Sequence, residues 1–410
     1  MVKRVAGQGS DLPATECNEG PPLMVHPTWN PRILISPVED GYVAYDAASD
    51  QLHHLNPIAA LLAELCDGTR TVEEIRDLVA PMLPPQSAGE IEYWIEEAAR
   101  AGLLVRNGSA QTWPQEMSAD ELATLASRLR AHGKIQPAFL CQQRAAERAP
   151  DDSEKWCSLG ELAHILGRRD DARRAYARYL ELEPDDAEIR HIMIALRDGP
   201  PPARVPDDCV QQLYSRFSSF YEKNVCDDLG YVGPENLRDM LEPLLSSRDR
   251  FDILDLGCGS GLAGVSFKSR AAILVGVDLS AEMIELARAR DLYDRLEVAE
   301  ITDWLARTSE RFDLILACDS FIYFGDLAQV SVPAAQLLRP GGLLAFTVEK
   351  GSRYPLVLTD SGRYQHHADH IREVAAAAGL RVERLEESFL RMEYGQEVTG
   401  LFVVLRQAMG

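Results

Sequence analysis

The spacing of apolar and polar residues changes along the chain and divides it into modules. Three short runs rich in strand-forming residues, separated by turn-forming clusters, cover residues 32–36, 41–45 and 51–55. Helical patterns follow, and they begin at Asn56, at Thr71 and at about Ser87. Residues 26–108 are therefore predicted to form three strands followed by three helices. Residues 1–25 are rich in Gly, Pro and polar residues and are expected to be a disordered tail.

The segment 117–198 has an internal helical period. Matching Pro-Asp-Asp triplets begin at Pro150 and Pro184, which lie 34 residues apart. A helical period of 34 residues resembles the tetratricopeptide repeat. The second copy carries the residues of that pattern at Trp156, Leu159, Gly160, Gly167, Ala172 and Tyr176. Two such repeats and a capping helix over 188–197 are expected to act as a spacer or as a docking surface for other biosynthetic enzymes. Peptide binding in the groove of the repeats is the alternative.

The last module follows a Pro-rich linker at 199–206 and covers residues 207–410. Strand candidates cover residues 251–256, 272–277, 312–318, 343–348, 381–385 and 401–406. Helical patterns separate most of them. This alternation predicts an α/β fold with a mostly parallel, doubly wound, Rossmann-like sheet.

Composition and charge narrow the class of partner. The chain has 410 residues, and 64 acidic against 42 basic residues give a net charge of −22. That balance argues against nucleic acid and anionic membranes, which need clustered Lys and Arg, and leaves small molecules, peptides and proteins. No apolar run suits a membrane span, no secretory signal is visible, and the eight cysteines form no CxxC. A cytoplasmic protein with reduced cysteines is expected.

The strongest chemical signal is a glycine-rich loop at the end of the first strand of this last module. Gly257, Gly259 and Gly261 follow that strand, and Asp278 ends the next one. Such a loop brings the backbone close to a ligand, and an acid after the second strand can accept both ribose hydroxyls of a nucleoside. The spacing differs from the G-x-G-x-x-G of dinucleotide sites, and Asp255 would repel a pyrophosphate. A cofactor with a cationic amino-acid portion fits better.

The module therefore resembles class I S-adenosylmethionine-dependent methyltransferases. The resemblance implies that Asp255 contacts the amino-acid portion of the cofactor, that the loop lies under it, and that Asp278 binds the ribose. Glu300 and Ile301 would lie near adenine, although the family usually has Asp at the first position. The full set of expected cofactor-binding residues is Asp255, Gly257, Cys258, Gly259, Gly261, Asp278, Leu279, Glu300, Ile301, Asp319 and Tyr214. Tyr214 and Tyr221 belong to a segment that forms a lid in this family.

A second cluster, Ser361–His370, resembles a Ser-Gly-Arg-Tyr-x-His segment that lies over the catalytic pocket in a subgroup of these enzymes. Arg363 could clamp a substrate carboxylate, and Tyr364 or His366 could position or deprotonate the substrate. The alternative is that these residues only order the loop. Tyr323, just past a predicted strand, is a further candidate for substrate contact or for core packing. No metal site is expected, because His366 and His370 have no clear third ligand.

Residues 27–106 resemble the PqqD-like peptide-recognition family. The matching pieces are 41–46, 52–57 and 65–75, in that order along the chain. The resemblance implies a small α+β, winged-helix-like domain that binds the leader of a precursor peptide as an added strand. The implied peptide-binding residues are Gln51, Leu52, His53, His54 and Leu55 on the edge strand and Ile91, Trp94, Ile95 and Ala98 on the third helix. The alternative is a domain used only for packing.

Together the two resemblances imply a methyltransferase that acts on a ribosomally made peptide held through its leader. A leader-binding module would raise the effective concentration of substrate near the catalytic module. The acceptor is expected to be a carboxylate or another heteroatom. Two alternatives stay open: a methyltransferase for small molecules or carrier-bound carboxylates, and a non-catalytic peptide chaperone or scaffold.

Overall fold

The structure is a computed structural model of the whole chain. It describes residues 3–4, 26–83, 88–106, 117–197, 199–217, 230–245, 249–393 and 396–408. The chain forms two compact units, Met1–Tyr179 and Leu180–Gly410. The division falls inside helix α7, so the first unit holds both the small α+β domain and most of the helical repeats.

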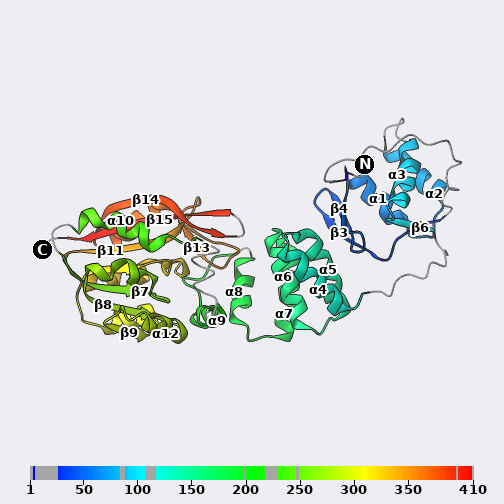
Figure 1. Cartoon of the computed structure of the whole chain (residues 1–410). Helices are drawn as coiled ribbons and strands as arrows, with labels where there is room; N and C mark the ends of the chain where they lie inside the picture. Colours follow the sequence, from blue (N-terminus) through cyan, green and yellow to red (C-terminus); the bar gives the residue numbers. More distant parts are fainter. Residues whose placement is uncertain are drawn as a thin grey trace, which may run out of the picture. The chain divides into compact units, whose positions relative to one another are not determined.

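The small domain of the first unit combines a four-stranded sheet with three helices (Figure 1). The strands are β1 (Lys3–Arg4), β3 (Ile33–Val38), β4 (Gly41–Asp46) and β5 (Gln51–Leu55), in the order β1-β5-β4-β3. A separate pair consists of β2 (Pro27–Trp29) and β6 (Leu104–Arg106). The helices are α1 (Pro57–Leu65), α2 (Val72–Val79) and α3 (Ala88–Arg100). The three main strands and three helices were predicted, and the caps at Asn56 and Thr71 are confirmed.

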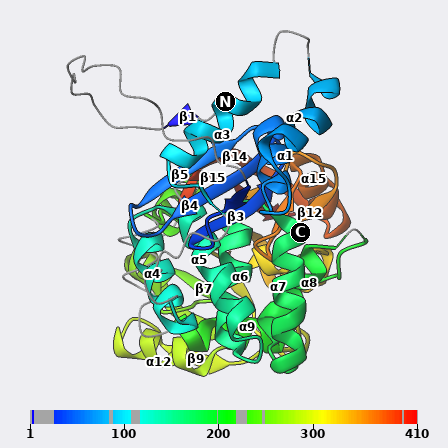
Figure 2. The same cartoon turned by 90° about the vertical axis from the view of Figure 1, so that its right-hand side faces the viewer.

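Both faces of this sheet are covered. Ala44 and Leu55 belong to the core shared with α1, α2 and α3. Because side chains alternate along a strand, Val43 and Tyr45 point to the opposite face, yet each is only 1% exposed. Helix α5 packs against β3 on this unit, and the two lie side by side in both views (Figures 1 and 2).

The helical repeats follow the predicted period. Their helices are α4 (Ala119–Ala131), α5 (Ile135–Arg148), α6 (Ser153–Ile165), α7 (Arg169–Leu182) and α8 (Ala187–Ala195). The first residues of α4, α6 and α8 are successively 34 residues apart, as are those of α5 and α7. A Cβ on Gly160 would lie 2.4 Å from the Tyr176 ring, so only glycine permits this close helix contact.

The second unit is built on a mixed sheet (Figure 1). Its central strands run in the order β9-β8-β7-β10-β11-β15-β14, parallel except for the pairings that involve β15. Their bounds are β7 (Phe251–Leu256), β8 (Ala271–Asp278), β9 (Arg295–Val298), β10 (Phe312–Ala317), β11 (Leu338–Lys350), β14 (Leu380–Glu393) and β15 (Gln396–Gln407). Short strands β12 (Leu356–Leu358) and β13 (Tyr364–His366) extend the far end of β11. The predicted Rossmann-like sheet is thus confirmed.

Helices pack on both faces of that sheet, and two apolar clusters form the two cores. The helices of this unit that follow α8 are α9 (Asp207–Phe217), α10 (Gly233–Leu241), α11 (Leu262–Phe267), α12 (Ala281–Ala289), α13 (Ile301–Arg307), α14 (Ala328–Leu337) and α15 (Ala368–Ala377). No helix in the described part of the chain combines the length and apolar character that a bilayer crossing needs.

The boundary between modules differs from the prediction in two ways. Helix α8, expected to cap the repeats, belongs to the second unit and packs against α9. The segment 199–206 is no free linker, because its backbone is bonded to the second unit. Val205 donates its N–H to the Tyr323 carbonyl at 2.8 Å, and the Ala203 carbonyl accepts from Gly325 N–H at 2.8 Å. Proline content had suggested a spacer, but these backbone bonds fix the segment as part of the wall of a cleft.

Candidate functional site

A cleft opens where β7, β8 and β10 end. Its empty volume is about 900 Å³, open solvent included. The segment 204–214 and η6 (Phe321–Tyr323) close its sides. Polar and charged side chains in the lining come from Arg204, Asp207, Tyr214, Tyr231, Asp255, Ser260, Asp278, Glu300, Asp319, Ser320 and Tyr323.

The glycine-rich loop forms the floor of this cleft. Gly257 has φ of +69°, and a Cβ there would lie 2.4 Å from the Ser320 Cβ. The loop is tied to the next strand by Asp278, whose Oδ2 accepts from Gly259 N–H at 2.8 Å. Its Oδ1 accepts from Ser280 N–H at 2.9 Å. Backbone bends that only glycine adopts readily therefore bring the main chain to the edge of the open volume.

Asp255, on β7, presents one unused oxygen atom. The side chain is 1% exposed, and its Oδ2 accepts from the Tyr293 hydroxyl at 2.6 Å. Its Oδ1 is buried and has no hydrogen-bond partner among the described residues. Burial raises the pKa of this carboxyl to about 7. A buried acceptor without a donor is costly, so the site suits a ligand that donates a hydrogen bond or carries positive charge.

The opposite wall contains an ion pair that sequence reasoning missed. Arg204 Nη1 donates to Glu300 Oε1 at 2.7 Å and also contacts Asp207 at 3.0 Å. Glu300 in turn caps α13 by accepting from Asp303 N–H at 2.8 Å. Ile301 and Leu279 line the same end of the cleft. Arg204 was overlooked because it lies in a Pro-rich segment interpreted as a linker.

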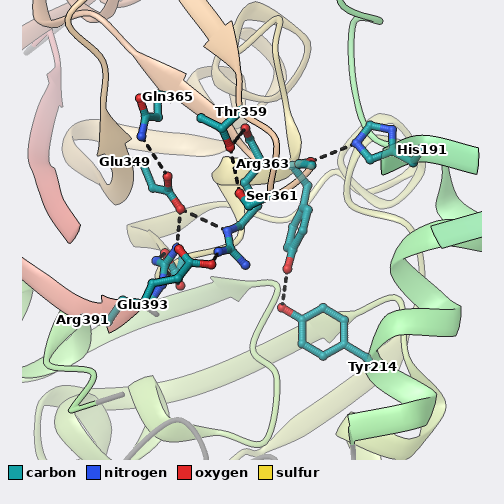
Figure 3. Close-up of polar contacts among 12 residues, drawn as sticks. His191, Tyr214, Glu349, Thr359, Ser361, Arg363, Gln365, Arg391 and Glu393 are labelled. Atoms are coloured by element: carbon teal, nitrogen blue, oxygen red, sulfur yellow. Dashed lines mark hydrogen bonds and ion pairs between the residues drawn. The ribbon is translucent and has the colours of Figure 1, made fainter. Parts of the chain in front are cut away.

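Asp319 marks the end of the cleft that follows β10. It has φ of +57°, a left-handed conformation that is uncommon for a residue other than glycine. Its N–H donates to Thr347 Oγ1 at 2.9 Å. Nearby, the hydroxyls of Tyr214 and Tyr323 are hydrogen bonded at 3.0 Å, which joins α9 to η6 (Figure 3). Burial raises the pKa of Asp319.

Asp319 belongs to a largely buried cluster of two arginines and three carboxylates, of which Figure 3 labels Arg363, Arg391, Glu349 and Glu393. Arg391 Nη1 contacts both carboxylate oxygens of Asp319 at 3.2 Å, and its Nη2 contacts Glu349. Arg363 Nε donates to Glu349 Oε1 at 3.1 Å, and its Nη2 contacts Glu393. Only Asp319 of these five residues lines the cleft. Both guanidinium groups are therefore already occupied by protein carboxylates.

Three predicted catalytic residues lie elsewhere than expected. Arg363, Tyr364 and His366 are not among the residues that line the cleft, whereas Tyr323 is. Tyr364 and His366 are fully buried in β13. The Tyr364 hydroxyl donates to the Pro202 carbonyl at 2.6 Å, and His366 Nε2 donates to the Phe324 carbonyl at 2.9 Å. These side chains fix the walls of the cleft, and Arg363 pairs with Glu349 and Glu393 and does not line the cleft.

His366 should make the stability of the fold sensitive to acid. Burial lowers its pKa to about 4, so between pH 6.5 and pH 4 the unfolded chain binds a proton that the folded chain does not. Wild type should therefore lose about 3 kcal/mol of stability across this range from His366 alone. His366→Gln, which keeps a donor for the Phe324 carbonyl, should lose correspondingly less. Urea unfolding at pH 7 and pH 4.5 compares the two; equal losses would contradict this role.

Nearly all the predicted cofactor-binding residues line the cleft. The exception is Gly261, which lies at the N-terminus of α11 with φ of +91°. Tyr221 lies outside the described residues. Among the described residues no group of three or more potential metal ligands comes together.

The predicted peptide-binding residues fall into two groups. The five from Gln51 to Leu55 form β5, to whose edge β1 pairs in antiparallel fashion, with Lys3 opposite His54. The four on α3 are all buried in the domain core, at most 6% exposed: Ile91, Trp94, Ile95 and Ala98. These four residues were predicted to line an open groove, and that prediction was wrong. The apolar stripe of α3 packs on α1 and α2 instead.

Two family models match the chain. The first describes a methyltransferase domain and matches residues 253–342, from within β7, through the glycine loop, to the beginning of β11. The second describes coenzyme PQQ synthesis protein D and matches residues 41–104, from β4 to the first residue of β6. The chain thus carries a methyltransferase domain in its C-terminal part and a PqqD domain in its N-terminal part.

Two curated O-methyltransferases are similar to less than a third of the chain each. The chain is 32% identical over 146 residues to a ubiquinone biosynthesis O-methyltransferase of Chelativorans sp. (strain BNC1), which covers 31% of this chain and 58% of that protein. It is 34% identical over 113 residues to a malonyl-[acyl-carrier protein] O-methyltransferase of Acetivibrio thermocellus. This match covers 27% of this chain and 39% of that protein. The chain therefore spans less than two thirds of the length of either relative. Among solved structures, magnesium protoporphyrin IX methyltransferase from Synechocystis PCC 6803 covers 49% of this chain and 99% of its own, with 14% identity and a TM-score of 0.39.

The residues of the cleft fit S-adenosylmethionine. The unpaired, buried Oδ1 of Asp255 suits the cofactor's ammonium group, and the Gly257 floor leaves no room even for a methyl side chain. Asp278 would hold the ribose, and Glu300 with Ile301 would border the adenine. When bound, this cofactor supplies an electrophilic methyl group on a sulfonium.

Cofactor affinity should depend on the ionisation of Asp255. Because its pKa in the cofactor-free protein is raised to about 7, lowering the pH protonates the group that faces the ammonium. Below pH 7 the affinity for S-adenosylmethionine should decrease as the pH falls, by up to about tenfold for each pH unit, and above pH 7 it should level off. Asp255→Asn should bind weakly and without this pH dependence. Calorimetry between pH 5.5 and 8.5 measures both, and parallel profiles for wild type and variant would refute the assignment.

Proposed function

We propose that this protein is an S-adenosylmethionine-dependent methyltransferase that modifies a ribosomally made precursor peptide held by its PqqD domain. The observation that carries the proposal is the coexistence in one chain of the two matched domains, together with a cleft in which Oδ1 of the buried Asp255 has no hydrogen-bond partner among the described residues. A tethered recognition domain raises the local concentration of its ligand, so the catalytic cleft can accept varied residues.

The leader would bind along the edge of β5. Backbone N–H and C=O groups on such an edge pair with an added strand and give affinity with little dependence on sequence. The antiparallel pairing of Lys3–Arg4 with His53 and His54 supports this use of the edge, since a short strand is accommodated there. A bound leader would take the place of β1. The helical repeats are the part of the chain through which other biosynthetic enzymes would dock.

Methylation would take place at the Asp319 end of the cleft, on an oxygen, nitrogen or other heteroatom. Tyr214, Tyr323 and Asp319 would align the acceptor, and the apolar residues around them would exclude water. Arg363 was the residue expected to clamp a carboxylate acceptor, and its position outside the cleft lining removes that support for a carboxylate. Both arginines of the cluster are paired with acids, and Arg204, the cleft's one lining cation in the described structure, is paired with Glu300 and Asp207. An acceptor without negative charge suits this lining better.

A methyltransferase for small or carrier-bound acids is the alternative favoured by the names of the relatives. One is named for ubiquinone biosynthesis and another for malonyl-acyl-carrier protein. That alternative gives the PqqD domain no catalytic role. A non-catalytic scaffold would need no working cofactor site, and the intact loop from Asp255 to Gly261 argues against it.

The function is tested with the full-length protein, S-adenosylmethionine and the short peptides encoded beside its gene. We expect one peptide to gain the mass of one or more methylene groups, at residues located by tandem mass spectrometry. Leu52→Pro, which interrupts β5, should abolish that gain at low peptide concentration while leaving cofactor affinity intact. Unchanged turnover in Leu52→Pro would favour the small-molecule alternative. Failure of the wild type to bind the cofactor would revive the scaffold.

A further inference from the structure

Open space lies beside β5 on the side of the helical repeats. This pocket belongs to the first unit and has an empty volume of about 1280 Å³, open solvent included. One wall consists of Gln51 to His54 on β5 together with Tyr45 and Asp50. The other consists of the five residues from Gly133 to Pro137, which join α4 to α5 and begin α5. We call these five residues the α4–α5 turn.

The alternation of β5 decides which of its side chains face the pocket. Leu52 pairs with Tyr45 and His54 pairs with Val43, whereas Leu55 pairs with Tyr42. Directly opposed residues of antiparallel strands share a face. Leu52 and His54 therefore share the face of Tyr45, turned away from the core that contains Leu55. This second face is the one that α5 covers.

One polar contact joins the α4–α5 turn to the sheet, and a second contact joins another part of the repeats to it. Lys134 forms an ion pair with Asp50, at the turn before β5. Further along the sheet, Arg168 Nη2 donates to Ser36 Oγ at 3.0 Å, and its guanidinium lies 4.4 Å from the centre of the Phe139 ring. The repeats are thus joined to the sheet at two places, one of which is the α4–α5 turn.

The chemistry of this wall suits an extended peptide. Ile135 and Pro137 offer apolar surface facing the pocket that Leu52 borders. Between them, Gln136 Nε2 is buried and has no hydrogen-bond partner among the described residues, so it can donate to a carbonyl group. In an extended peptide, an apolar side chain could pack on Ile135 and Pro137 while a neighbouring backbone carbonyl accepts from Gln136 Nε2. On the other face of β5, the α3 stripe is closed within the core.

We propose that the α4–α5 turn is the second wall of the peptide site and reads every other side chain of a strand added to β5. The inference rests on the proposed function and assigns the repeats a part in recognition. In an added strand, side chains alternate between the two faces of the sheet. Those on the core side would meet the helices of the PqqD domain, and those on the other side would meet Leu52, Ile135 and Gln136. Apolar residues are expected at the latter positions.

The test uses the full-length protein and a displayed library of random peptides about 20 residues long, enough to span a strand and its flanks. The tightest peptide recovered becomes the fluorescent probe for anisotropy titrations. Ile135→Asp should weaken its binding about tenfold or more, because a charge would face an apolar side chain. Leu125→Asp is the matched control, since Leu125 is similarly buried on α4 and lies outside the pocket. If Ile135→Asp unfolds at a lower temperature than the control, the milder variant Gln136→Ala replaces it in the binding measurement.

The pattern of coupling separates recognition from general destabilisation. Each residue along the bound stretch of the probe is replaced by alanine, and the loss of affinity is measured with wild type and with Ile135→Asp. With Ile135→Asp the loss should disappear at every second position of the probe and persist at the positions between. Equal affinity of the probe for wild type, Ile135→Asp and Gln136→Ala would overturn this inference and leave the proposed function standing. Failure to recover any binding peptide would overturn peptide recognition itself.

Discussion

Replacing Gly257 by alanine is expected to abolish cofactor binding, with a loss of affinity of about 100-fold or more. The new Cβ would lie 2.4 Å from the Ser320 Cβ. Ser320 cannot give way easily, because its hydroxyl donates to the Leu256 carbonyl at 2.8 Å and its side chain is buried. The loop would have to move into the cleft, and its φ of +69° adds backbone strain of about 1–2 kcal/mol for alanine.

Gly379→Ala is the matched control for that change. Gly379 has φ of +71° and lies between α15 and β14, and a Cβ at this position would meet no other atom within 4 Å. It should suffer the same backbone strain without the clash. Calorimetry with S-adenosylhomocysteine and thermal unfolding are measured on both variants. If Gly379→Ala lost as much affinity as Gly257→Ala, strain alone would explain the effect and the loop would not be the floor of the cofactor site.

Local sequence signals sufficed for the cofactor half of the site. The loop, Asp255 and Asp278 lie within one strand–turn–helix–strand unit, so their spacing along the chain determines their spacing in space. Caps such as Thr71 were equally local. These features depend on neighbours a few residues away, which a single sequence displays directly.

The acceptor half could not be predicted in the same way. Arg391 reaches Asp319 from β14, 72 residues later in the chain. Arg204 reaches Glu300 from a segment that its prolines made resemble a linker. Tyr364 and His366 have side chains typical of catalysis, but the pairing of β13 turned both into buried positions. Sequence shows which groups are reactive and leaves open which of them face solvent.

The same limit explains the third helix of the PqqD domain. Its apolar stripe was interpreted as a groove, yet the stripe that packs a helix into a core has the same period as one that binds a peptide. Only the packing of α3 on α1 and α2 distinguishes the two. Peptide binding by the repeats was an alternative prediction, but no sequence pattern marked the α4–α5 turn for it. Its place beside β5 is visible only in the structure.

Arg391→Met is expected to destabilise the protein by about 3–5 kcal/mol at pH 7.5. The substitution keeps the apolar part of the side chain but removes the cation between Asp319 and Glu349, whose carboxylates are largely buried. Arg384→Met is the control, because the pair Arg384–Glu386 is exposed and such pairs contribute about 0–1 kcal/mol. Urea unfolding of both variants and wild type gives the three free energies.

The pH dependence of Arg391→Met identifies the cause of its loss. Burial already raises the pKa of Asp319 in the wild type, and removing the guanidinium should raise it further. A carboxyl whose folded pKa exceeds its unfolded value binds more protons in the folded state, so acidification favours folding. The deficit of Arg391→Met relative to wild type should therefore shrink between pH 7.5 and pH 5, while that of Arg384→Met stays nearly constant. A deficit that is the same at both pH values would mean that lost packing, and not the unpaired carboxylates, destabilises the variant.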